Sequence, residues 1–165
     1  MRSKQGKRAT ILGRREGAIP RPITLWLEPV ISIATLARLH YDLGWPEMQL
    51  GLQTADYAFD VATYCGTDGR GLAIACEVKK TRLEVDHLIS DLQQYCLNPA
   101  SEPTSSKPRQ LNSYRKLLSL RKNQPTFLWI VGPDGYNSAF AVGHANGSIS
   151  LTPISAEDLR YEQEP

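Results

Sequence analysis

The chain has 165 residues, of which 41% are hydrophobic and 22% charged, and its net charge is +2. This composition indicates one globular domain and excludes a wholly disordered chain. No run of about 18 apolar residues occurs, which excludes a membrane-spanning helix and predicts a protein without a membrane partner. Cys65, Cys76 and Cys96 lack the spacing of a zinc site or a disulfide framework, so we expect reduced thiols and a cytoplasmic location.

Apolar spacing and turn residues then predict the secondary structure. A helix is expected over 28–43, because apolar residues recur at helical intervals until Gly44-Trp45-Pro46 ends the run. The later elements are, in chain order, strands over 57–64 and 72–79 joined by a turn at 66–69, a helix over 83–97, a loop over 98–109, a helix over 111–122, and strands over 126–131 and 138–142. This order predicts an α/β fold in which helices flank a mixed central β-sheet.

The charged residues are unevenly distributed along the chain. Residues 1–22 contain seven basic side chains and one acid, which leaves the rest of the chain acidic, and a second basic cluster lies at 107–122. Such segments suit a polyanionic partner, although a solvated helix face and a flexible tail explain them equally well. We divide the chain into a basic flexible arm over 1–22, a domain over 23–156 and an acidic tail over 157–165.

Three charged residues interrupt the apolar strands around 57–79. Glu77 and Lys79 share one face of their strand, since alternate side chains point the same way, and Asp60 lies on the strand before them. Two adjacent carboxylates suit a hard divalent cation, and a lysine beside it would orient water, with a pKa lowered by burial next to the metal. A solvent-exposed Glu–Lys pair is the simpler alternative.

These residues carry a resemblance to a nuclease family. Phe59-Asp60-Val61, Ile74–Lys80 and the helix Leu88–Tyr95 resemble the PD-(D/E)xK superfamily, and are similar in particular to the nuclease domain at the start of type I restriction motor subunits. The resemblance implies a restriction-endonuclease-like αβββαβ core. It also implies Mg²⁺, for which Mn²⁺ can substitute, held by Asp60 and Glu77, with Lys79 as the catalytic lysine.

Glu28, Asp91 and Tyr95 lie at three further positions that bear on the resemblance. Glu28 matches an additional acidic position, but stabilisation of the helix dipole explains it equally well. One branch of the family has Gln-x-x-x-Tyr on the helix after the lysine strand, where this chain has Asp91 before Tyr95. We expect Tyr95 to be a core aromatic, and Asp91 either supports the site or faces solvent.

The sequence therefore predicts a Mg²⁺-dependent endonuclease that cleaves DNA in restriction or DNA processing, with RNA as the less favoured substrate. A homodimer or a partner subunit is compatible with this prediction. The alternative is a catalytically inactive module of the same fold that binds nucleic acid or assembles with other proteins. The basic residues expected to contact phosphates are Lys80, Arg82, Arg115, Lys116, Arg121 and Lys122.

Overall fold

The computed structural model describes residues 26–65, 71–97, 108–145 and 147–162. The basic arm predicted at 1–22, the turn predicted at 66–69 and most of the loop predicted at 98–109 lie outside these described residues. The α-helices are α1 (Leu27–Tyr41), α2 (Arg82–Leu97) and α3 (Pro108–Asn123). The strands are β1 (Leu50–Leu52), β2 (Val61–Cys65), β3 (Gly71–Val78), β4 (Phe127–Val131), β5 (Asn137–Ala145) and β6 (Ser148–Ile154), with short 3-10 helices η1 (Glu47–Gln49), η2 (Pro133–Gly135) and η3 (Ala156–Leu159).

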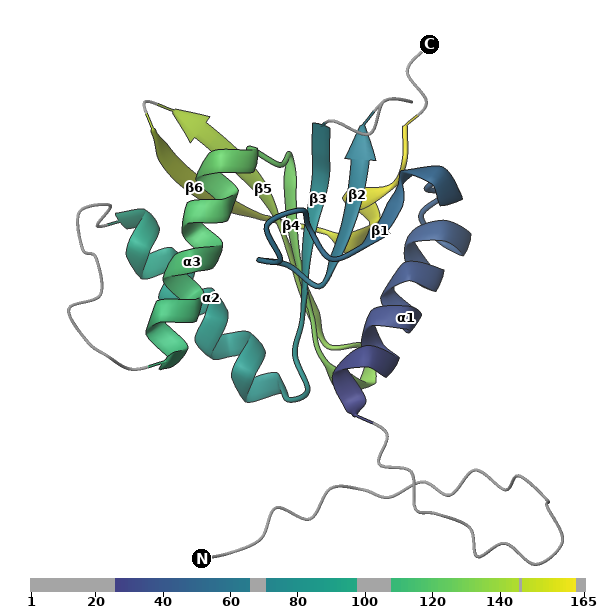
Figure 1. Cartoon of the computed structure of the whole chain (residues 1–165), viewed down its shortest axis with the longest axis horizontal. Coiled ribbons are helices and arrows are strands. Elements are labelled where there is room, and N and C mark those ends of the chain that lie inside the picture. The colour runs from purple at the N-terminus through teal and green to yellow at the C-terminus, as the bar shows by residue number, and fades with distance from the viewer. Residues whose placement is uncertain (1–25, 66–70, 98–107, 146, 163–165) are drawn as a thin grey trace, which may run out of the picture.

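The strands form one mixed sheet in the order β1-β2-β3-β4-β5-β6. Only β3 and β4 pair in parallel among these neighbours, and the other pairs are antiparallel. A parallel pair requires a long crossover connection, which α2 and α3 provide. Helices α2 and α3 cover one face of the sheet and α1 covers the other (Figure 1). The predicted α/β class with helices on a mixed sheet is confirmed.

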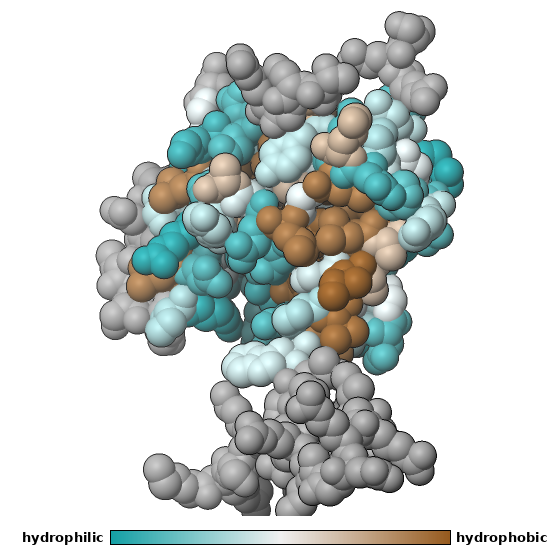
Figure 2. Space-filling model, turned by 45° about the vertical axis from the view of Figure 1, so that its right-hand side comes forward, coloured by the Kyte–Doolittle hydropathy of each residue, from teal (hydrophilic) through white to brown (hydrophobic). Residues whose placement is uncertain are grey.

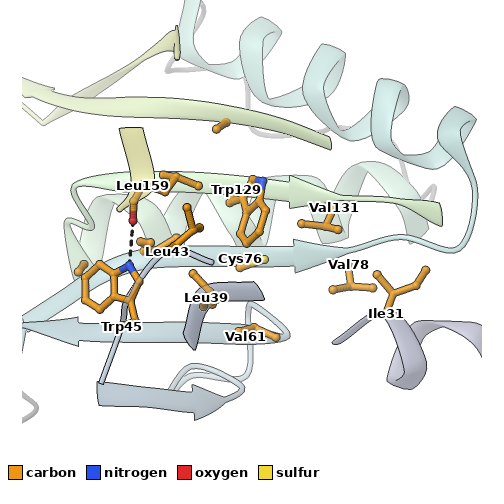
Figure 3. Packing of buried hydrophobic residues seen from close by; sticks show 13 residues of the cluster. Ile31, Leu39, Leu43, Trp45, Val61, Cys76, Val78, Trp129, Val131 and Leu159 are labelled. Atoms are coloured by element: carbon orange, nitrogen blue, oxygen red, sulfur yellow. Dashed lines mark hydrogen bonds between the residues drawn. The ribbon is translucent and has the colours of Figure 1, made fainter. Parts of the chain in front are cut away.

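The core on the α1 side of the sheet includes the C-terminal segment. Leu159 is fully buried, and its carbonyl accepts a hydrogen bond of 2.8 Å from Trp45 Nε1 (Figure 3). The N–H of Tyr161 donates to the carbonyl of Leu43 at 2.8 Å, and the Tyr161 ring packs against Trp45. The folded unit therefore extends past the predicted boundary at residue 156, because an apolar side chain of the predicted tail fills the core.

Three strands differ from the prediction. β2 begins at Val61 and not at residue 57, because residues 53–60 form a hydrogen-bonded loop in which Tyr57 has a φ of 55°. β1 and β6 were not predicted: β1 has three residues, and β6 is largely exposed and contains Pro153. Both are edge strands, where one neighbour and solvent exposure weaken the apolar pattern that marks a strand.

The outer surface of α1 carries several exposed apolar side chains. Figure 2 shows apolar side chains gathered on the side of the molecule that carries α1, where Leu27, Val30 and Ile33 are exposed. In the part of the chain that the structure describes, no helix is long and apolar enough to cross a membrane.

Candidate functional site

The pairing of β2 with β3 brings the two predicted carboxylates together. Val61 pairs with Cys76 in an antiparallel register, so Asp60, just before β2, comes beside Glu77. The N–H of Asp60 donates to the carbonyl of Cys76 at 3.0 Å, and Asp60 Oδ2 accepts the N–H of Val78 at 2.9 Å. These bonds fix the Asp60 side chain at the end of the strand pair, next to Glu77.

Glu77 lies on the sheet face covered by α2 and α3, and only 2% of its surface is exposed. Its Oε1 accepts a hydrogen bond from Lys79 Nζ, and its Oε2 lies 2.5 Å from Lys116 Nζ. Val78, between Glu77 and Lys79, points into the core on the α1 side. The predicted alternation along β3 is therefore confirmed, and Glu77 is a buried carboxylate held between two ammonium groups.

Lys116 is the site residue that sequence reasoning placed elsewhere. We expected it to contact phosphates, but it is 5% exposed and reaches inward from α3. Its Nζ donates to the carbonyl of Ala58 as well as to Glu77, and lies 5.1 Å from the centre of the Phe59 ring. Lys116 thus joins the segment before Asp60 to the strand that carries Glu77.

The sequence does contain a signal for this position. The buried positions of α3 recur at helical spacing and are Ser113, Lys116, Leu117, Ser119 and Leu120. A lysine within such a buried stripe is paired with an acid, since an unpaired buried charge is strongly unfavourable. The pattern alone does not identify the acid, which lies 39 residues earlier in the chain.

Burial and neighbouring charges shift the pKa values of Glu77 and Lys79. Burial raises the pKa of Glu77, against the opposing effect of Lys116 and Lys79. Burial alone would lower the pKa of Lys79, but its ion pair with Glu77 raises it, and Asp60 and Glu28 act in the same direction. The pKa of Lys79 is thus raised because the neighbouring acids outweigh desolvation, and a lowered pKa beside a bound metal stays a prediction.

A pocket of about 200 Å³ opens beside Lys79. It lies between α2, α3 and the first turn of α1, and gives the buried cluster a route to solvent. Its lining residues are Glu28, Lys79, Glu84, His87, Leu88, Arg109, Asn112, Ser113 and Lys116. Glu28, the weakest of the predicted acidic ligands, therefore reaches the same pocket as the catalytic candidate Lys79.

A second hydrogen-bond network fixes the loop that leads to Asp60. Asp56 accepts hydrogen bonds from Ser119 at 2.7 Å, from Asn123 at 2.8 Å and from Thr54 at 2.8 Å. Partial burial would raise the pKa of Asp56, but these bonds, Ser119 first, and one from the Ala58 N–H lower it to about 2. The network attaches the loop to α3. Sequence reasoning missed it, because its members are common surface residues far apart in the chain.

Asp91 and Tyr95 connect α2 to α3. Asp91 is buried and accepts hydrogen bonds from Ser113 at 2.9 Å and from Arg109 at 3.1 Å. A solvent-facing Asp91 is therefore wrong. The Tyr95 ring is buried in the core, as expected, and its hydroxyl lies 3.4 Å from the carbonyl of Gln110. Neither residue lines the pocket, but both partners of Asp91 do.

The other basic candidates lie at different depths. Lys80, Arg82, Arg115 and Lys122 are exposed, and Arg121 is half-buried. The ammonium of Lys80 lies 3.6 Å from Glu84, and the guanidinium of Arg82 lies 5.3 Å from the centre of the Tyr136 ring. The exposed residues are available to an anionic partner, whereas Lys116 is not.

Asp60 and Glu77 are the candidate ligands for a divalent cation. Within residues 26–65, 71–97, 108–145 and 147–162, no group of three or more His, Cys, Asp or Glu side chains is placed to hold a metal ion. Asp60 and Glu77 nevertheless offer hard oxygen ligands, and Mg²⁺ is commonly held by one or two carboxylates with water completing its shell. The residues therefore fit a Mg²⁺-type ion with two protein ligands, and Lys79 now pairs with one of the oxygens that the ion would use.

Comparison with known proteins gives no further assignment. No protein-family model matches the chain, and searches of curated proteins and of solved structures give no significant match.

Proposed function

We propose that this protein is a Mg²⁺-dependent endonuclease, with Mn²⁺ able to substitute, that hydrolyses DNA phosphodiester bonds. The observation that carries the proposal is the cluster itself. Asp60 and Glu77 meet through strand register, and Lys79 lies on the same face of β3 at the wall of a pocket. Two adjacent carboxylates, with a lysine that lines a pocket, are the groups that metal-assisted phosphodiester hydrolysis needs.

The order of elements supports the same proposal. The run α1, β1, β2, β3, helix, β4 follows the αβββαβ order of a restriction-endonuclease-like core, with α2 and α3 together in the place of the second helix. In this arrangement Glu77 lies on the central strand β3 with Lys79 just after its end, and Asp60 lies just before the antiparallel neighbour β2. The proposed family thus agrees with both the topology and the positions of the charged residues.

Each residue of the cluster has a proposed role. Asp60 and Glu77 hold the cation, which when bound activates water and offsets charge on the phosphate. Lys79 orients the attacking water, whose oxygen forms the new P–O bond while the bond to the leaving oxygen breaks and that oxygen takes up a proton. Lys116 keeps Glu77 in place. Exposed basic residues near the pocket, Lys80 among them, hold the phosphate backbone.

Substrate and location follow from weaker observations. DNA is preferred over RNA on the family resemblance, and a homodimer or a partner subunit remains compatible with the proposal. The free thiols of Cys65, Cys76 and Cys96 suit a cytoplasmic protein.

A second candidate is a non-catalytic module that binds nucleic acid or assembles with proteins. One observation favours it: both oxygens of Glu77 already pair with lysines, so the cluster is complete as a structural ion-pair network. The two candidates differ in their response to metal. An active site gains thermal stability with Mn²⁺ through ligand linkage, whereas a structural network does not.

The test is cleavage of supercoiled plasmid with Mg²⁺ or Mn²⁺. We expect nicking and linearisation by the native protein, and their loss in Asp60→Ala and Lys79→Ala. Arg160→Ala is the control, because Arg160 is an exposed basic residue after η3 that does not line the pocket. Without cleavage and without Mn²⁺-induced stabilisation of the native protein, the non-catalytic module becomes the better assignment.

A further inference from the structure

The ammonium of Lys79 occupies a defined position against Glu77. It pairs with Oε1, and Asp60 and Glu28 are close enough to act on its charge. A lysine that is paired with one acid and influenced by the charges of two others occupies an electrostatic environment that would otherwise attract a mobile cation. The side chain of Lys79 is also the more accessible of the two lysines, at 18% exposed against 6% for Lys116.

The other oxygen of Glu77 is held differently. Lys116 pairs with Oε2 from within the packed α3 side of the sheet, and its remaining contacts are the Ala58 carbonyl and the Phe59 ring. The ammonium of Lys116 is therefore held at three points, and its side chain is the less exposed of the two lysines. Lys79 directly follows β3 and lines the same pocket of about 200 Å³ as Lys116, but its side chain is the more exposed of the two.

We infer that Lys79 is a built-in competitor of the divalent cation: its ammonium takes the cation's place at Glu77 Oε1, and metal loading is an exchange in which Lys79 leaves while Lys116 keeps Oε2. The inference rests on the proposed metal site and adds a regulatory property to it. Metal affinity is then set by the strength of the Lys79–Glu77 pair, and Lys79 becomes free for the substrate only after the cation has entered.

The exchange predicts an unusual effect of substitution. Removing Lys79 removes the competitor, so Mn²⁺ affinity rises although the proposed catalytic group is lost. The increase should be about tenfold or more, because a hydrogen bond between charged groups is worth at least one decade in affinity. A merely structural lysine would leave Mn²⁺ affinity unchanged or lower it through damage to the fold.

The experiment titrates the metal without DNA. Free Mn²⁺ is measured by electron paramagnetic resonance in titrations of three full-length proteins: the native protein, Lys79→Met and Lys79→Gln. Lys80→Met is the matched control, since it removes the same charge one residue away, at an exposed position outside the pocket. We expect tighter Mn²⁺ binding in both Lys79 variants and an affinity within about twofold of native in the control, because exposed charges are screened.

A second measurement needs no variant. Lysine acetylation by acetic anhydride, followed by mass spectrometry, is compared with and without Mg²⁺. We expect Mg²⁺ to raise the labelling rate of Lys79 while Lys116 stays protected and Lys80 keeps its rate. Native or weaker Mn²⁺ affinity in both Lys79 variants, or no rise in Lys79 labelling, overturns the inference. Absence of plasmid cleavage with the exchange intact would instead remove the proposed activity and leave the competition standing.

Discussion

Replacement of Lys116 by methionine tests the buried ion-pair cluster directly. The substitution keeps the length and apolar character of the side chain while it removes the ammonium. Glu77, 2% exposed, then loses the partner at Oε2, and the Ala58 carbonyl loses its donor. Breaking one side of a buried ion pair costs about 3–5 kcal/mol. Because Lys79 still pairs with Oε1, we expect the lower end, about 3 kcal/mol.

The loss is measurable by urea unfolding and by thermal melting. For a domain of this size, about 3 kcal/mol corresponds to a melting temperature lower by about 6–12 °C. Lys122→Met, an exposed lysine on the same helix, is the control and should stay within about 0.5 kcal/mol of native.

A double-mutant cycle separates the pair from general damage. Lys116→Met combined with Glu77→Gln removes both charges of the pair. Loss of Glu77 alone leaves the buried Lys116 without its acid, and loss of Lys116 alone leaves Glu77 Oε2 without its partner. Each single variant thus breaks the contact between Lys116 and Glu77 Oε2, so we expect the double variant to lose about 2 kcal/mol less than the sum of the single losses. A Lys116→Met protein as stable as the control, or additive single effects, would refute the reasoning that this pair organises the site.

Three further predictions concern the surroundings of the site. The pKa of Asp56, about 2, lies below its usual 3.8, so its contribution to stability is present above that usual value and is lost as the pH falls through about 2. At pH 6 the free energy of unfolding of the native protein should exceed that of Asp56→Asn by at most about 1 kcal/mol, since the exposed Asp56 is screened by solvent. The difference in melting temperature between the two should shrink between about pH 4 and 2. Leu159→Ala should lose about 2–5 kcal/mol in urea unfolding, because its fully buried side chain fills the core; a loss below about 0.5 kcal/mol would show that the C-terminal segment is a detached tail. Asp91→Ala should lose about 2 kcal/mol in thermal melting, because the buried Ser113 hydroxyl and the Arg109 guanidinium lose their acceptor; an unchanged melting temperature would contradict a structural role for Asp91.

The elements with long, regular apolar patterns were predicted from the sequence. The helices and the strands β3, β4 and β5 lie within a few residues of the ranges expected, since their buried faces repeat at the period of each structure. β1 and β6 were not predicted, because edge strands bury few side chains and so lack a clear apolar pattern. The start of β2 was predicted too early because Tyr57 adopts a positive φ, which interrupts an extended strand and is uncommon for tyrosine.

Some residues of the candidate site were likewise identified from the sequence, and others were not. Asp60, Glu77 and Lys79 were identified because charges in apolar strands are unfavourable unless they are paired or used. Lys116 and Asp56 were not placed in the site, because the contacts that tie Lys116 to β3 and Asp56 to α3 join residues at least 39 positions apart. A local pattern shows that a side chain is buried, but not which distant group it meets.

The sequence by itself determined the α/β class, the shared face of Glu77 and Lys79, and the chemical character of the cluster, because strand periodicity and residue type are local properties. Only the tertiary structure decided which charges meet. The antiparallel register sets Asp60 beside Glu77, and the packing of α3 brings Lys116 to the second oxygen of that carboxylate. Those contacts are fixed by the register and packing of segments that are distant in the chain.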